Sequence, residues 1–129
     1  MILVDTSSWI HFLRPDGDGE VRARVGAALR AGTACWCSLV RLELWNGAGG
    51  AREKKVLREF ERLVPELAID AAIWSEACVL ARRCRAAGVS VPATDILIAA
   101  CARHHGARLE HADSDFDAIA RVSARDGDR

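Results

Sequence analysis

Four acidic residues stand at positions where a folded chain would bring side chains together. Asp5 ends the apolar run at 2–4, Glu43 interrupts the apolar run at 39–45, Asp95 opens a strongly apolar segment and Asp113 follows the last predicted strand. Like charges about 4 Å apart repel by roughly 4 kcal/mol per pair at an effective dielectric near 20. A convergent group would therefore need cations, and carboxylates without histidine or thiolate suit Mg²⁺ or Mn²⁺. Such a site could direct water in line at a phosphodiester.

Each of these acids also has a purely structural explanation. Asp5 and Asp113 precede predicted helices, and aspartate is among the best N-cap residues. Asp95 would be favoured in a first helical turn by the helix dipole. Glu43 is harder to explain structurally, because a helix flanked by leucine and tryptophan has little solvated surface and a buried carboxylate needs a partner, a proton or a metal. Capping and metal binding both remain open for the aspartates, whereas a functional role is favoured for Glu43.

The spacing of apolar residues predicts alternating strands and helices. Strands are expected at 2–4, 33–38, 65–70 and 107–111, and helices at 7–13, 20–31, 39–45, 52–63, 71–87 and 95–105, with a short helix after Asp113. The apolar face of the helix at 52–63 would consist of Val56, Leu57, Phe60 and Leu63. This alternation predicts the α/β class, with a parallel sheet covered on both faces and ligands at the carboxyl ends of its strands. Residues 1–124 are expected to form a single domain, followed by a charged, frayed tail at 125–129.

Composition narrows the kinds of protein that the chain could be. The 129 residues carry a formal net charge of zero, so nucleic-acid binding would require a local basic patch. Five cysteines without a C-x-x-C pair fit buried free thiols in a reducing cytosol. The N-terminus lacks a secretory pattern and the longest apolar run, 96–102, is too short for a membrane span. A soluble cytoplasmic protein without a membrane partner is expected.

Several other motifs are excluded by their missing positions. The run Asp113-Ser-Asp115-Phe-Asp117 opens like an EF-hand loop, but Ala118 and Ala124 stand where glycine and glutamate are required. The glycine-rich segment at 47–55 lacks the G-K-[ST] of a phosphate loop. The four histidines show no zinc spacing, and no hydrolase triad can be selected. A phosphatase-type nucleophile at Asp5 is disfavoured because no second aspartate follows two residues later.

Four segments together resemble the PIN-domain nucleases and, within them, the VapC-type toxins. These segments are Ile2–Trp9, Leu42–Gly47, Asp95–Ala100 and His111–Phe116. Their order and their spread over nearly the whole chain make the resemblance specific, although any one segment alone would be weak.

This resemblance implies a PIN-like three-layer fold with a short central parallel sheet flanked by helices. It also implies that the protein is the toxin of a type II toxin–antitoxin pair, with endoribonuclease activity that depends on Mg²⁺ or Mn²⁺. Asp5, Glu43, Asp95 and Asp113 would form the catalytic metal site, and Asp115 would be an additional or substitute ligand. By the same resemblance, Ser7 would support the first aspartate and Thr94 would be the polar residue beside the third.

The resemblance also implies partners. They are a second copy in a homodimer, a cognate VapB-type antitoxin whose C-terminal segment occupies the active-site groove, and a structured RNA substrate such as tRNA. Two other functions remain open: a housekeeping PIN-domain nuclease in RNA processing or repair, and a catalytically silent binding module in which the acids act only as caps.

Some residues depart from the resemblance or adjoin its motifs. Glu110 stands in the last predicted strand where relatives usually carry an apolar residue, so either that strand is exposed or a further carboxylate lies near the site. Candidate RNA contacts, each more simply explained as a solvated surface charge, are Arg14, Arg41 and Arg52. Core or dimer packing is the favoured role of the four tryptophans, which are Trp9, Trp36, Trp45 and Trp74. Trp9 and Trp45 adjoin motif residues, so lining the antitoxin groove is a secondary interpretation for these two.

Overall fold

A short parallel sheet lies at the centre of the protein. The computed structural model describes residues 1–127, with side chains described as far as residue 125. The strands are β1 (Ile2–Val4), β2 (Ala34–Cys37), β3 (Glu66–Leu67) and β4 (Arg108–Glu110), in the spatial order β3-β2-β1-β4. All three pairings are parallel, so the carboxyl ends of the strands meet at one edge.

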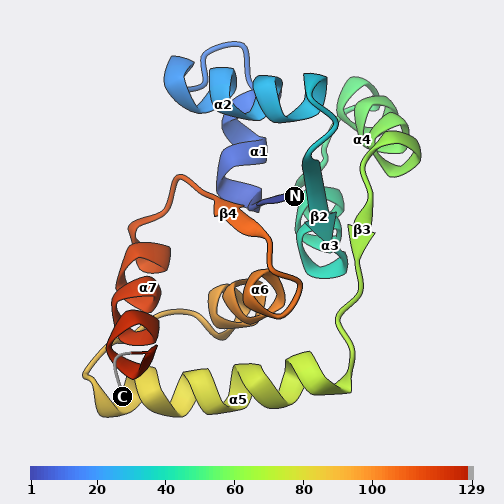
Figure 1. The fold of residues 1–129 in the computed structure, drawn as a ribbon. Helices are drawn as coiled ribbons and strands as arrows, with labels where there is room; N and C mark the ends of the chain where they lie inside the picture. The colour runs from blue at the N-terminus through green and yellow to red at the C-terminus, as the bar shows by residue number, and fades with distance from the viewer. Residues whose placement is uncertain (128–129) are drawn as a thin grey trace.

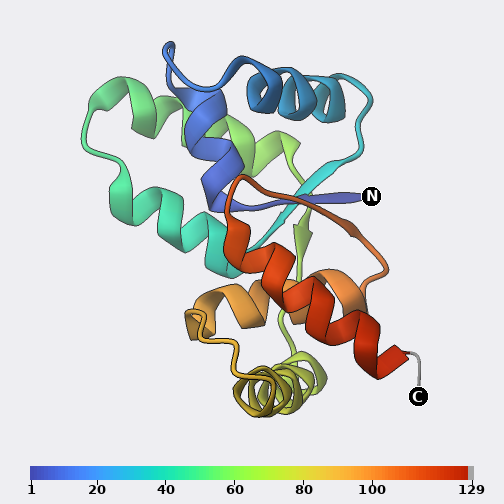
Figure 2. The same cartoon turned by 90° about the vertical axis from the view of Figure 1, so that its left-hand side faces the viewer.

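Helices cover both faces of this sheet. They are α1 (Thr6–Leu13), α2 (Gly19–Arg30), α3 (Ser38–Gly47), α4 (Ala51–Leu63), α5 (Ala71–Ala86), α6 (Ala93–His104) and α7 (Ser114–Gly127). Figures 1 and 2 show α1, α2 and α4 on one side of the sheet and α5, α6 and α7 on the other. The predicted α/β class, with a short central parallel sheet between layers of helices, is therefore confirmed.

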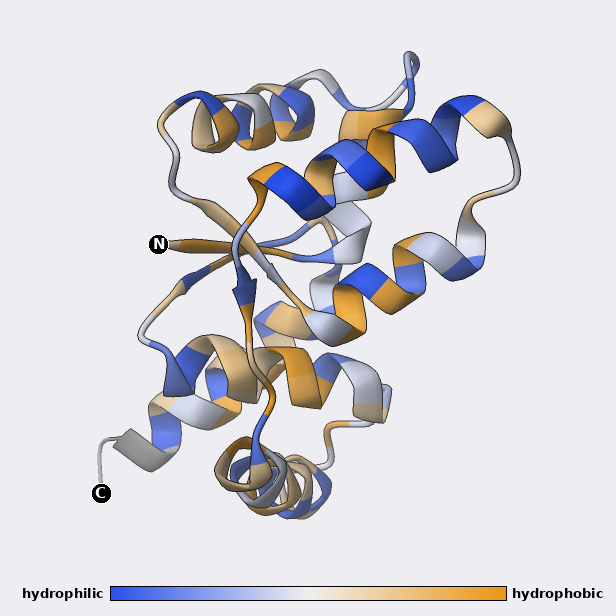
Figure 3. Ribbon diagram, turned by 90° about the vertical axis from the view of Figure 1, so that its right-hand side faces the viewer, coloured by the Kyte–Doolittle hydropathy of each residue, from blue (hydrophilic) through white to orange (hydrophobic). Residues whose placement is uncertain are grey.

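The core joins the sheet to the helices of both layers. All four residues of β2 are buried, as expected for a strand covered on both faces. In α6 the seven consecutive residues 96–102 are buried, whereas α4 is hydrophilic over most of its length (Figure 3). Trp9 of α1, Trp36 of β2 and Phe60 of α4 pack with ring centroids 5.0–6.4 Å apart. This aromatic contact fixes α1 and α4 against the sheet.

Some predicted boundaries were wrong for identifiable reasons. The strand expected at 65–70 contains only Glu66 and Leu67, since Asp70 instead accepts a hydrogen bond from the Ile73 N–H and caps α5. Leu63 is exposed because it ends α4, and the following residue, Val64, is buried in its place.

The C-terminal helix was also underestimated. It spans 14 residues, whereas only a short helix was expected, because Phe116, Ile119 and Val122 form a buried face at helical spacing. Residues 125–127 of the expected tail therefore belong to α7, and residues 128–129 lie outside the described residues.

Four cysteines are buried, as predicted, but Cys78 is exposed. Within residues 1–127, no helix combines the length and apolarity needed to cross a membrane.

The aromatic contact yields a prediction about stability. Trp36 is only 1% exposed, so Trp36→Ala should lower the free energy of unfolding by about 3–5 kcal/mol, because apolar burial is lost and a cavity is left behind. Trp74 is 55% exposed, so Trp74→Ala should change it by less than about 0.5 kcal/mol. Urea denaturation measures both variants, and equal losses would contradict this account of the core.

Candidate active site

Three aspartates meet at the carboxyl edge of the sheet. Asp95 lies in the first turn of α6, Asp113 directly precedes α7, and Asp115 lies in the first turn of α7. One carboxylate oxygen of each lies within 4.8 Å of an oxygen of the other two. The Asp113 Oδ1 also accepts a hydrogen bond of 2.9 Å from the Asp115 N–H, so Asp113 caps α7 while belonging to the acidic group.

Asp5 is held beside this group by a serine. Asp5 is buried at the N-cap of α1, where its Oδ2 accepts hydrogen bonds from the Ser7 N–H at 3.0 Å and the Ser7 hydroxyl at 2.6 Å. The Ser7 Oγ in turn accepts a bond of 3.0 Å from the Ala112 N–H. One serine thus joins Asp5 to the residue before Asp113. Capping occupies only Oδ2, and Oδ1 has no hydrogen bond to any residue described.

Glu43 is partly buried and has a threonine partner. The Thr6 hydroxyl donates a hydrogen bond of 2.9 Å to the Glu43 Oε1. Burial raises the pKa of Glu43 above its ordinary value; the Thr6 hydrogen bond opposes this shift and the charge of Asp5 adds to it. Sequence reasoning missed Thr6, although its place between Asp5 and Ser7 was an available signal.

The electrostatics of Asp95 connect all five carboxylates. Burial is the largest cause that raises its pKa to about 7, followed by the negative charges of Asp113, Asp5, Asp115 and Glu43. The structure thus brings the five predicted acids to one edge, with the three aspartates of α6 and α7 in the tightest group and Asp5 and Glu43 beside it.

The other residues singled out in the sequence do not join the acidic group. Thr94 is exposed in the first turn of α6, and its side chain has no hydrogen-bond partner within the described part of the chain. Glu110 is partly buried and lies beside the site, where its carbonyl accepts a hydrogen bond from the Asp5 N–H, but its carboxylate pairs with Arg24 and is not among the charges that raise the pKa of Asp95. Trp9 is fully buried and so cannot line a groove.

The candidate RNA contacts differ in their surroundings. Arg41 forms ion pairs with Glu61 and Glu66, which supports the surface-charge interpretation. Arg14 and Arg52 are exposed, and Arg14 lines a pocket beside the acids.

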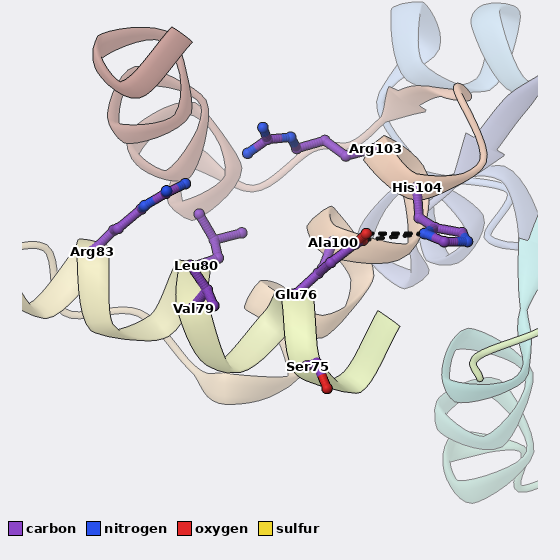
Figure 4. Close-up of a pocket in the computed structure, with 8 residues that line it drawn as sticks. All are labelled: Ser75, Glu76, Val79, Leu80, Arg83, Ala100, Arg103 and His104. Carbon is purple, nitrogen blue, oxygen red and sulfur yellow. Dashed lines mark hydrogen bonds and ion pairs between the residues drawn. The ribbon is translucent and has the colours of Figure 1, made fainter. Parts of the chain in front are cut away.

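Two pockets differ in their relation to the acids. A pocket of about 440 Å³ between α5 and α6 contains none of the five carboxylates (Figure 4). A smaller one of about 230 Å³ is formed by α1, α3 and α4 and includes Glu43. Its other lining residues are the charged Arg14 and Glu53, Gly47, and five apolar side chains: Ile10, Leu13, Leu44, Ala48 and Leu57. The apolar surface beside the acids is therefore this second pocket.

The raised pKa of Asp95 predicts an unusual pH dependence of stability. In the metal-free protein the folded state holds a proton on Asp95 up to about pH 7, whereas the ordinary pKa is 3.8. The free energy of unfolding should therefore fall as the pH rises from about 4 to 7. Asp95→Asn should flatten this slope and stabilise the metal-free protein at pH 7.5 by on the order of 1–2 kcal/mol, after allowance for solvent screening.

Denaturant unfolding in buffer with chelator, repeated between pH 4 and 8, measures this dependence. The exposed Asp16 serves as the control, and Asp16→Asn should keep the slope of the unsubstituted chain. A slope that Asp95→Asn leaves unchanged would contradict the assignment.

Comparison with known proteins places this geometry in a family. The PIN-domain family matches residues 2–122. Ribonuclease VapC11 of Mycobacterium tuberculosis is 36% identical over 126 residues, covering 95% of this chain and 94% of the relative.

Solved structures with the same fold include VapC20 of M. tuberculosis, which is described as a Sarcin-Ricin loop cleaving toxin. It matches at 23% identity and a TM-score of 0.70, over 92% of this chain and 94% of the other. DNA-bound VapBC from Salmonella typhimurium matches at 19% identity and a TM-score of 0.69, over 85% and 96% of the two chains.

The family match covers nearly all of the chain, and the match to VapC11 spans 95% of it. The chain therefore belongs to the PIN-domain family and, within it, to the VapC-type ribonuclease toxins of toxin–antitoxin systems.

Proposed function

We propose that the chain is an endoribonuclease toxin that cleaves structured RNA with the help of Mg²⁺ or Mn²⁺ bound within its cluster of five carboxylates. The observation that carries this proposal is the convergence of Asp95, Asp113 and Asp115, each of which offers a carboxylate oxygen within 4.8 Å of the other two. In agreement with this crowding, burial and the four other acids raise the pKa of Asp95 to about 7. Like charges gathered in a half-buried place destabilise a fold unless a cation compensates them.

The side chains fit a hard divalent cation. The donors are carboxylate oxygens only, and three of them lie within 4.8 Å of one another. Asp95, Asp113 and Asp115 would hold the ion, together with the Oδ1 of Asp5 that capping leaves available. When bound, Mg²⁺ or Mn²⁺ would activate water and stabilise negative charge on a phosphodiester.

Glu43 and the hydroxyl residues would have separate tasks. Glu43 is partly buried, its pKa is raised chiefly by that burial, and the Thr6 hydroxyl orients it. A raised pKa makes the carboxylate a better proton acceptor, so we assign to it the acceptance of a proton from the attacking water. Ser7 orients Asp5 against the segment that carries Asp113. Attack in line would most simply leave 3′-hydroxyl and 5′-phosphate ends.

The substrate that we propose to test first is tRNA. The net charge of zero means that RNA contacts must be local, with Arg14 and Arg52 as exposed candidates beside the site. A housekeeping nuclease is disfavoured because VapC relatives match over 95% of the chain. A silent binding module is disfavoured because capping uses only one oxygen of Asp5 and does not explain Glu43.

The partner that we propose is a cognate VapB-type antitoxin. The apolar pocket of α1, α3 and α4 adjoins Glu43 and could receive the apolar face of a short peptide segment. A positively charged side chain of that segment would be attracted by the neighbouring acids. We further propose a homodimer in the cytoplasm, where RNA and antitoxin would be encountered.

Cleavage of total tRNA tests the proposed activity. Purified protein with Mn²⁺ should produce discrete fragments, and chelator should abolish them. Asp5→Asn and Asp95→Asn should each lower the rate at least about 100-fold, because each removes charge from the metal site. Sequencing of both fragment ends identifies the cut positions and the end chemistry.

The matched control is Asp16→Asn, an exposed aspartate of the loop after α1, which should retain full activity. Fragments that persist in chelator or in both site variants would reveal a contaminating nuclease or a different mechanism. No cleavage together with no thermal shift on adding Mn²⁺ would leave the binding-module alternative.

The proposed antitoxin groove gives a separate prediction. Ile10 lines the pocket and is 37% exposed, so Ile10→Glu should weaken antitoxin binding more than about 10-fold by placing a charge on an apolar contact. Val79 is 40% exposed on α5, and Val79→Glu is the matched control that should retain affinity. Titration of each variant with the antitoxin encoded beside the toxin measures the difference, and equal weakening would disprove this location.

A further inference from the structure

Glu110 joins three elements around the acidic site. Its Oε2 accepts a hydrogen bond of 2.7 Å from the Ser8 hydroxyl of α1, and its Oε1 accepts one of 2.6 Å from the Arg24 Nε of α2. Its backbone carbonyl accepts a third, of 2.9 Å, from the Asp5 N–H. One residue of β4 therefore contacts α1, α2 and the first acidic residue.

The burial of these groups makes their partnership necessary. The Ser8 side chain is fully buried, and the side chain of Glu110 is 12% exposed. A buried hydroxyl or carboxylate without a partner is costly, so each secures the position of the other. Arg24, which is half exposed, neutralises the carboxylate from the solvent side.

Glu110 does not belong to the acidic group itself. Successive side chains of a strand point to opposite faces, and the side chain of Glu110 points toward α1 and α2. It is absent from the charges that raise the pKa of Asp95. Its influence on the site must therefore pass through the backbone.

The backbone route is short. Asp5 lies three residues before Ser8, and Asp113 lies three residues after Glu110. Between them, the Asp5 N–H binds the Glu110 carbonyl and the Ser7 hydroxyl joins the Asp5 carboxylate to the Ala112 N–H. The Ser8–Glu110 bond is a third connection between the same two segments, so α1 and the segment at 110–113 are joined at successive points.

We propose that Glu110 is a positioning residue, which acts with Ser8 and Arg24 to set the distance between Asp5 and the aspartates of α7. This inference rests on the proposed metal site. An apolar residue at position 110 could pack against α1, but it could not bind the buried Ser8 hydroxyl or pair with Arg24. This chain thus uses a polar connection across the β1–β4 edge to hold its acids apart at a fixed spacing.

Mn²⁺ affinity and amide exchange in the full chain test the proposal. Glu110→Val should weaken Mn²⁺ binding about 10-fold, at the lower end of the range seen when groups behind metal ligands are changed. The Ala112 N–H should also exchange faster with solvent in the metal-free protein, because the segment is less firmly held. Isothermal titration and hydrogen exchange measure the two effects well below the unfolding temperature.

Two further variants separate positioning from simple stability. Glu110→Gln keeps the shape of the side chain, and its amide can still form hydrogen bonds with both Ser8 and Arg24. This variant should therefore retain Mn²⁺ affinity within about 3-fold. Glu110→Val with Ser8→Ala removes the unpaired buried hydroxyl, so it should unfold at a higher temperature than Glu110→Val alone while its Mn²⁺ affinity stays weak.

The matched control is Glu66→Val, which removes another strand glutamate that pairs with an arginine, at the far edge of the sheet. Its Mn²⁺ affinity should equal that of the unsubstituted chain. Unchanged Mn²⁺ affinity in Glu110→Val, or affinity that recovers with stability in the double variant, would overturn the positioning role. An unsubstituted chain that binds no Mn²⁺ would instead overturn the proposed metal site and this inference with it.

Discussion

Mutual repulsion among five carboxylates at the carboxyl edge of the sheet is the constraint around which this structure is organised. Three helix N-termini point into the same place, since Asp5 caps α1, Asp113 caps α7 and Asp95 lies in the first turn of α6. A helix terminus contributes about 0.3–1 kcal/mol to a nearby negative charge, whereas one close pair of like charges costs roughly 4 kcal/mol. The helix dipoles reduce the repulsion but do not remove it, which is why we propose a divalent cation.

The acids cannot relieve this repulsion by moving apart, because the elements that carry them are held by the core. Asp95 directly precedes the seven buried residues of α6, and displacement of its helix would expose them. Asp5 lies between buried Val4 of β1 and the helix that carries Trp9, which packs against Trp36 and Phe60. Apolar burial in both layers thus holds an electrostatically unfavourable arrangement in place, as is common at functional sites.

Capping and metal binding, which compete as explanations of the sequence, coexist in the structure. An aspartate has two oxygens, and Asp5 uses Oδ2 for the Ser7 N–H and hydroxyl while Oδ1 stays available. The Asp113 Oδ1 likewise accepts a hydrogen bond from the Asp115 N–H. A cap fixes the orientation of a carboxylate, so it prepares the second oxygen for a ligand. The same residue types therefore satisfy both the helix and the proposed site.

The sequence by itself determined the α/β class and the acidic positions, because apolar periodicity and strand-to-helix junctions are local properties of a chain. It placed Asp5, Asp95 and Asp113 at such junctions, and parallel strands bring junctions to one edge. Only the tertiary structure decided the partners: Thr6 bonds Glu43 across 37 positions, and Glu110 bonds Ser8 across 102. Those contacts depend on how helices pack on the sheet, and no local pattern in a single sequence encodes which distant side chains will meet.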